Sequence, residues 1–199
     1  MTLRVLSSFA RDQRGVSAVE FALLAPVLLM MVMGIFDLGH NMYTSAMLQG
    51  AIQQAARNST IEGAAANPGA LDALVTQAVR SISPNATLQF ARTAYANFSD
   101  VGQGEDFVDS DSDTICNNGE AFEDANGNGT WDADQGTAGQ GGARDAVLYA
   151  VTISYPRLFP IARLIPGQTD TFTMNSQTVL RNQPYGLQDT SAPATGNCP

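Results

Sequence analysis

Lysine is absent from this chain, and other reactive side chains are scarce: 199 residues hold one His, two Cys and one Trp. All ten basic residues are Arg, and nineteen acidic residues bring the formal net charge to -9. This balance leaves no basic surface of the kind that binds nucleic acid. A zinc site, a Ser/His/Asp triad or a Cys/His pair needs more His or Cys than the spacing offers. The sequence therefore predicts neither an enzyme nor a nucleic-acid partner.

The negative charge is concentrated in one stretch of the chain. Residues 100–134 contain no Arg and eleven carboxylates: Asp100, Glu105, Asp106, Asp109, Asp111, Asp113, Glu120, Glu123, Asp124, Asp132 and Asp134. A run this dense must be solvated, bind cations, or do both. The chain as a whole is 44% hydrophobic, which excludes a disordered protein and predicts one domain with appendages.

A long apolar run near the N-terminus predicts a membrane span. Residues 16–36 are apolar apart from Ser17, Glu20 and the small Gly34. If this run forms a helix with a rise of about 1.5 Å per residue, its length matches the thickness of a hydrocarbon core, about 30 Å. No small-x-small cleavage site ends the run, so it differs from an ordinary secretory signal and should be retained.

Charged residues around the run predict its orientation. Three arginines precede it, Arg4, Arg11 and Arg14, and the next one in the chain is Arg57. The positive-inside rule then places the N-terminus in the cytoplasm and the rest of the chain outside. We expect a single-pass membrane protein with its head outside the cytoplasm.

Glu20 is the unusual residue of the predicted span. An ionised carboxylate inside a bilayer costs several kcal/mol unless it is paired, so this residue is a candidate functional site. The alternative is that it snorkels to the nearby cytoplasmic interface.

The residues around Glu20 resemble the processing site of type IV prepilins, reading RGVSAVEF over residues 14–21. The resemblance implies that a prepilin peptidase cuts after Gly15, which removes residues 1–15 as a leader and makes Val16 the new N-terminus. It also implies that Glu20, followed by the aromatic Phe21, pairs with the N-terminal amine of a neighbouring subunit. Such pairing would make the buried charge tolerable and set the register of assembly.

A wider stretch is similar to the TadE-like family of tight-adherence (Flp) pilus assembly proteins. It reads RGVSAVEFALLAPVLL over 14–29, GIFDLG over 34–39 and LQGAIQQAAR over 48–57. The resemblance covers roughly residues 14–60 and implies a pseudopilin, or minor pilin, that works with other pilin subunits, prepilin peptidase and the lipid bilayer. It also implies a protein of the bacterial inner membrane whose head is periplasmic, or extracellular in a pilus. Asp37 stands where Glu is more often expected.

The remainder predicts an α+β, pilin-like head. We expect a helix extension over 37–62, a head over 68–182, an acidic insert over 100–142 and a loosely ordered tail over 183–199. Pro68 fits the first turn of a second helix whose apolar face precedes Pro84. Three stretches are typical of strands: 87–98, 146–155 and 169–180.

The acidic insert contains a calcium-loop pattern. Side-chain oxygens occur at loop positions 1, 3, 5 and 9, with Gly at position 6. Gln135 replaces the usual Glu at position 12, so Asp134, Glu120 or Glu123 would have to complete the shell. The candidate ligands are Asp124, Asn126, Asn128, Thr130, Asp132 and Asp134. The alternative is an Asx-rich turn that binds no ion.

A second acidic run precedes this loop. Oxygens stand at positions 1, 3, 5, 9 and 12, supplied by Asp109, Asp111, Asp113, Asn117 and Glu120. Thr114 occupies position 6, where Gly is usual. The pattern favours a second Ca²⁺ site or one shared with the first, and the opposing interpretation is again a solvated loop.

The two cysteines, Cys116 and Cys198, would be oxidised if the fold brought them together outside the cytoplasm. A bridge would tie the C-terminus to the acidic insert, and two free thiols are the alternative. Two functions follow from the whole pattern. One is a pseudopilin-like component of a Flp pilus with a calcium-stabilised head. The other is a membrane-anchored calcium-binding surface protein or adhesin outside any filament.

Overall fold

The computed structural model describes residues 15–59, 67–160, 166–182 and 191–199. Most of the predicted leader, the arginines before the apolar run, the end of the predicted helix extension and the start of the predicted tail lie outside these ranges. The chain divides into two compact units, Met1–Tyr43 with Arg157–Phe172 and Thr44–Pro156 with Thr173–Pro199.

The first unit contains most of the N-terminal helix. Helix α2 runs without interruption over Val16–Ser59, with Pro26 inside it. Its most apolar window has a mean hydropathy of 2.3 and no residue buried by the protein. Among the described residues, α2 is the one helix that is both long enough and apolar enough to cross a membrane. This finding is consistent with the predicted single span.

The second unit is built on the C-terminal part of α2. Its buried residues recur at three- and four-residue intervals, as one face of a helix requires: Thr44, Leu48, Ile52, Ala55 and Ser59. Helix α3 spans Pro68–Arg80, begins at the predicted proline and buries Leu71, Val75 and Val79. Leu74 of the same helix is exposed, because a face set by residues 71, 75 and 79 turns position 74 to one side.

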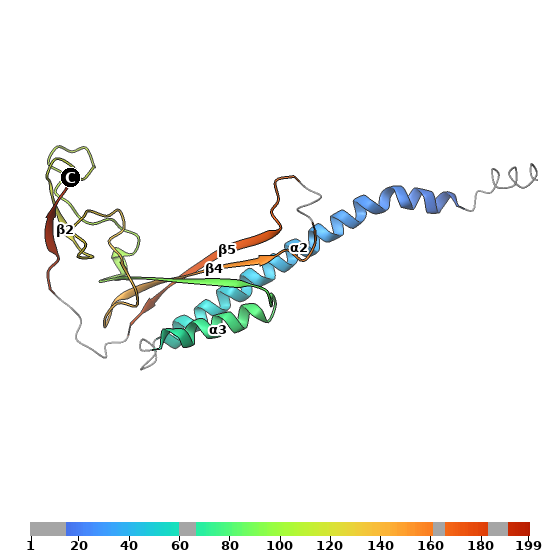
Figure 1. Ribbon diagram of the computed structural model, residues 1–199, viewed down its shortest axis with the longest axis horizontal. Coiled ribbons are helices and arrows are strands. Elements are labelled where there is room, and N and C mark those ends of the chain that lie inside the picture. The colour runs from blue at the N-terminus through green and yellow to red at the C-terminus, as the bar shows by residue number, and fades with distance from the viewer. Residues whose placement is uncertain (1–14, 60–66, 161–165, 183–190) are drawn as a thin grey trace, which may run out of the picture. The chain divides into compact units, whose positions relative to one another are not determined.

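An antiparallel sheet completes the core of this unit, with strand order β3-β1-β4-β5. The strands are β1 (Thr87–Tyr95), β3 (Thr137–Ala138), β4 (Ala146–Pro156) and β5 (Thr171–Arg181). Strand β4 is central, and alternate residues from Val147 to Tyr155 are buried. Figure 1 shows β4 and β5 beside the two helices, so the predicted α+β, pilin-like arrangement is confirmed.

Strand β1 ends earlier than the sequence predicts. Residues Phe98–Asp100 form a short 3-10 helix, η1, instead of continuing the strand. The Asp100 carboxylate accepts hydrogen bonds from the Asn97 backbone at 3.1 Å and from its amide side chain at 3.0 Å. This local capping offers the backbone an alternative to the sheet, and it ends the strand.

A second, two-stranded sheet joins the acidic insert to the C-terminus. Strand β2 (Ala121–Asp124) pairs antiparallel with β6 (Ala194–Asn197). The prediction of a loosely ordered tail is therefore wrong for these last residues, since backbone pairing holds them in a strand. Gly196 is required there, because a Cβ atom at that position would lie 2.3 Å from the Phe122 ring.

Asp72 connects helix α3 to the sheet. Its carboxylate accepts hydrogen bonds from Arg92 at 2.5 Å and from the Tyr149 hydroxyl at 2.7 Å. Tyr149 is fully buried, and this burial, followed by its bond to Asp72, raises the pKa of its hydroxyl. The guanidinium of Arg92 also lies 4.7 Å from the centre of the Tyr149 ring.

We predict that Asp72→Asn lowers the free energy of unfolding by about 2 kcal/mol, because it leaves a largely buried Arg92 without its counter-charge. Urea unfolding of the full chain in detergent micelles, followed by circular dichroism, measures the change. Asp170→Asn, on an exposed residue, is the control. Equal stabilities of the two variants would contradict the role of Asp72.

Candidate functional site

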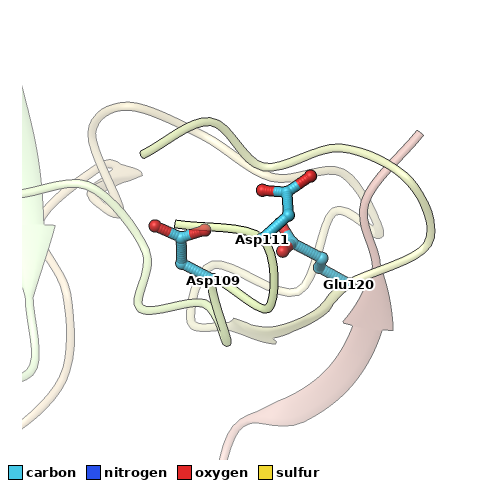
Figure 2. Close-up of side chains that lie close together, drawn as sticks. All are labelled: Asp109, Asp111 and Glu120. Carbon is cyan, nitrogen blue, oxygen red and sulfur yellow. The ribbon is translucent and has the colours of Figure 1, made fainter. Parts of the chain in front are cut away.

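The first acidic loop, residues 109–120, folds around the side chain of its first aspartate. Asp109 accepts the backbone N–H groups of Asp113 at 3.2 Å and Thr114 at 3.0 Å. Carboxylate oxygens of Asp109, Asp111 and Glu120 lie within 4.8 Å of one another, and Figure 2 shows these three side chains on the loop. The loop thus gathers acidic groups that could hold a metal ion.

The second acidic loop, residues 124–135, has the same arrangement. Asp124 accepts the backbone N–H groups of Asn128 at 3.0 Å and Gly129 at 2.9 Å. Asn128 in turn accepts the backbone N–H of Thr130 at 2.8 Å, just as Asp113 accepts that of Ile115 at 2.8 Å. Equivalent loop positions therefore make equivalent hydrogen bonds in the two loops.

The backbone conformations of the two loops also correspond. Positions 4 and 6 have positive φ in both: 62° at Ser112 and 64° at Thr114, and 73° at Gly127 and 80° at Gly129. Glycine adopts this conformation without strain, whereas a β-branched threonine rarely does. The absence of Gly at position 6 of the first loop therefore does not change its path.

A buried glutamate closes each loop, and the two are equivalent. Glu120 accepts the backbone N–H of Ser110 at 2.5 Å and of Asn117 at 3.4 Å, which are positions 2 and 9 of the first loop. Glu105 accepts those of Ala125 at 2.8 Å and Asp132 at 3.1 Å, positions 2 and 9 of the second loop. Glu105 is 3% exposed and Glu120 is 7% exposed.

Glu105 thus stands where the second loop lacks a glutamate at position 12. It comes from upstream of the first loop, so it is outside the sequence window in which a calcium loop is normally sought. Its backbone N–H donates to the Asp132 carbonyl at 3.0 Å, as that of Glu120 donates to the Asn117 carbonyl at 3.1 Å.

An internal repeat in the sequence could have identified Glu105. Residues 105–117 read EDFVDSDSDTICN and residues 120–132 read EAFEDANGNGTWD, so Glu, Phe and the loop oxygens recur at the same offset. The structure pairs the two copies: Phe107 and Phe122 form an antiparallel bridge. Each glutamate closes the loop of the other copy: Glu105 closes the second loop, and Glu120 closes the first.

The other candidate ligands occupy different places. Asn126 and Asn128 donate side-chain hydrogen bonds to the Asp132 carboxylate at 2.9 and 2.5 Å. These bonds lower the pKa of the Asp132 carboxyl below its ordinary value of 3.8. The carboxylate therefore keeps its negative charge to a lower pH than an ordinary aspartate does. Asn117 Oδ1 is a buried acceptor without a hydrogen-bond donor among the described residues.

Asp134 faces the main sheet. It accepts the hydroxyl hydrogen bond of Tyr95 at 3.1 Å, and the backbone N–H of Gly136 at 3.1 Å. The pKa of the Tyr95 hydroxyl is raised, chiefly by burial and secondly by this bond to Asp134. Glu123, the other upstream carboxylate considered from sequence, is exposed. The structure therefore brings Glu105 to the second loop, and no sequence criterion had singled it out.

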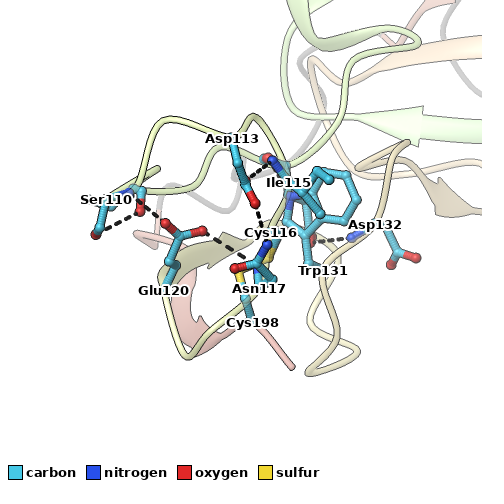
Figure 3. The surroundings of a disulfide bond; sticks show 11 residues. Ser110, Asp113, Ile115, Cys116, Asn117, Glu120, Trp131, Asp132 and Cys198 are labelled. Carbon is cyan, nitrogen blue, oxygen red and sulfur yellow. Dashed lines mark hydrogen bonds between the residues drawn. A yellow bond between two sulfur atoms is a disulfide. The ribbon is translucent and has the colours of Figure 1, made fainter.

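A small apolar core lies beneath the loops and contains a disulfide. Cys116 and Cys198 are joined, with their Cα atoms 5.2 Å apart, and they are buried with Phe122. Trp131 packs against this cluster and donates its indole N–H to the Glu105 carbonyl at 2.8 Å. Figure 3 shows the disulfide together with Trp131 of the second loop and residues of the first.

The residues of the predicted processing site are exposed at the start of α2. The first backbone hydrogen bond of the helix runs from Val19 to the Gly15 carbonyl at 3.1 Å, so Gly15 stands at the helix boundary. A Cβ atom on Gly15 would meet no atom within 4 Å. Glu20 and Phe21 are both exposed, and Phe21 retains 63% of its surface.

These observations define a pilin-like α+β protein with one uncovered apolar helix. Residues 15–57 match the model of the TadE-like protein family, so this segment is a TadE-like domain and the resemblance predicted from sequence is confirmed for it. Comparison with curated proteins and with solved structures finds no match.

We predict that replacing both cysteines by Ser loosens the small sheet before the main one. The bridge closes a separation of 82 residues, for which loss of the constraint costs about 2–4 kcal/mol. Hydrogen exchange of the full chain should show faster exchange in β2 and β6 while β1 and β4 stay protected. Unchanged exchange in β2 would contradict a stabilising role for the bridge.

Proposed function

We propose that the protein is a pseudopilin-like component for assembly of a tight-adherence type IV pilus, with a calcium-stabilised head. The observation that carries this proposal is the TadE-like domain at residues 15–57, which begins at Gly15 and contains an exposed glutamate within an apolar helix. The family implies a role in the tight-adherence pilus machinery. The protein acts there as a structural component.

Processing would prepare Glu20 for assembly. Cleavage after Gly15 leaves a positive amine at Val16, one helical turn from the Glu20 carboxylate. In a bundle of such helices, the carboxylate pairs with the amine of a neighbour, which offsets the cost of placing either charge in the membrane. The N-terminus then lies on the cytoplasmic side of the inner membrane and the head on the periplasmic side.

We predict that the mature chain begins at Val16, as measured by intact mass after expression with an active prepilin peptidase. Gly15→Leu should abolish cleavage without disturbing the fold, because open space surrounds the Cβ position. Persistence of residues 1–15 in the native protein would contradict the assignment and favour a permanently anchored surface protein.

We also predict that Glu20→Gln leaves insertion into the membrane intact or improved while pilus assembly falls at least about tenfold, since one lost charge pair in the membrane is worth more than 1.4 kcal/mol. Piliation, counted by electron microscopy, and membrane fractionation measure the two effects. Ser17→Ala, in the same turn, is the matched control. Normal piliation of the Glu20 variant would instead support snorkelling to the interface.

Calcium would stabilise the head through both acidic loops. Each loop offers carboxylate, amide and backbone oxygens, the hard donors that Ca²⁺ prefers, and each has one buried glutamate, Glu120 or Glu105. The buried Asn117 Oδ1, at a ligand position of the first loop, is a further available oxygen. Without a cation, the eleven carboxylates of this segment repel one another.

We predict that chelation makes the acidic insert the first region cleaved in limited proteolysis of the full chain in detergent, because calcium binding stabilises the folded insert by mass action. Glu105→Gln should weaken calcium binding about tenfold or more, as measured by calorimetry. Glu123→Gln, on an exposed carboxylate of the same segment, is the matched control.

Recovery of protease resistance by Glu105→Gln at saturating calcium would show that this variant still folds. Equal resistance of the unmodified chain with calcium and with chelator, or calorimetry without calcium binding, would reduce the loops to Asx-rich turns.

A further inference from the structure

A buried ion pair fixes a turn of the chain to the end of the apolar run of α2. Asp37, the first residue after that run, is only 5% exposed and forms a salt bridge with Arg157. Asn41, one turn further along the helix, donates to the same Asp37 oxygen at 3.1 Å. The second oxygen of Asp37 is buried without a hydrogen-bond donor among the described residues.

Arg157 also holds together the two ends of its own turn. Its Nε atom donates to the Thr169 carbonyl at 3.0 Å and its Nη2 atom to Gln168 Oε1 at 3.1 Å. Its guanidinium carbon lies 5.3 Å from the centre of the Phe172 ring. Arg157 thus joins the two ends of this turn through Nε and Nη2, and it joins the turn to α2 through Nη1.

Two apolar residues follow Arg157, the exposed Leu158 and the half-buried Phe159. Leu158 is 62% exposed, and the Phe159 ring lies 6.4 Å from that of Phe36. Phe36, the last residue of the apolar run, is itself 63% exposed. An apolar patch therefore continues from the helix onto the turn, at the position where the run ends.

We propose that Leu158 and Phe159 insert into the interfacial region of the bilayer leaflet next to the head, seated there by the Asp37–Arg157 pair. The proposal rests on the membrane span proposed above, since lipid that covers Phe36 would also reach the ring beside it. Apolar contact is the expected mode of binding, because Arg157, the cation of this patch among the described residues, is neutralised by Asp37 and the net charge of the chain is -9.

The test places a tryptophan at the turn of the full mature chain and measures its depth. Leu158→Trp is reconstituted in phosphatidylcholine vesicles that contain lipids brominated at shallow or deep acyl positions. The unmodified chain gives the contribution of Trp131, which is subtracted. Shallow bromines should quench the added tryptophan about twofold more than deep ones, because interfacial side chains lie about 5–10 Å into the headgroup boundary.

A second variant separates failure of this proposal from failure of the span. Leu28→Trp, at an exposed position in the apolar run, should be quenched most by the deep bromines. Quenching at position 28 without quenching at 158 overturns the insertion of the turn and leaves the span in place; another protein subunit then becomes the candidate to cover Leu158. Absence of quenching at both positions overturns the span, and the proposed function with it.

The salt bridge is tested in the same assay. Asp37→Asn, combined with Leu158→Trp, should lose at least half of the shallow quenching, whereas Asp170→Asn should keep it. Circular dichroism checks that helix content is unchanged. Full quenching in the Asp37 variant would overturn the role assigned to the ion pair.

Discussion

An apolar helical surface that its own chain leaves uncovered is the constraint on which the rest of this protein depends. No residue in the most apolar part of α2 is buried by other described residues. Lipid can cover such a surface, but lipid alone does not satisfy the charge of Glu20. A helix of this kind is stable in the membrane and still gains from a neighbour that brings an opposite charge. That need for a partner connects the TadE-like domain to assembly.

The head has the opposite difficulty, because its acidic loops carry more negative charge than the surrounding side chains neutralise. The structure meets part of this need with backbone N–H groups, which point at Asp109, Asp124 and the two buried glutamates. A disulfide and a small aromatic core then hold the duplicated loops together. Bound calcium would supply the remaining positive charge, so metal binding and folding of this segment would be one process.

Local sequence patterns were sufficient for the parts of the fold that local forces determine. The apolar run, the start of α3 at Pro68 and the alternation within β4 all follow from hydrophobic periodicity and proline chemistry. Hydrophobic periodicity does not assign Glu105, because its place beside the second loop depends on the pairing of the two repeat copies. The repeat itself is the signal in the sequence that marks this residue. The strand at residues 194–197 was missed because its partner, β2, lies far away in sequence.

Photocrosslinking from the exposed face of the N-terminal helix tests the assembly claim most directly. A benzophenone amino acid replaces Phe21, which lies beside Glu20 and is 63% exposed. The experiment uses cells that express the pilus machinery and peptidase, and mass spectrometry identifies the adducts. The account predicts adducts to the processed apolar helix of a pilin or pseudopilin subunit, and their loss in the Glu20→Gln variant. Adducts to lipid alone, in cells that assemble pili, would contradict it.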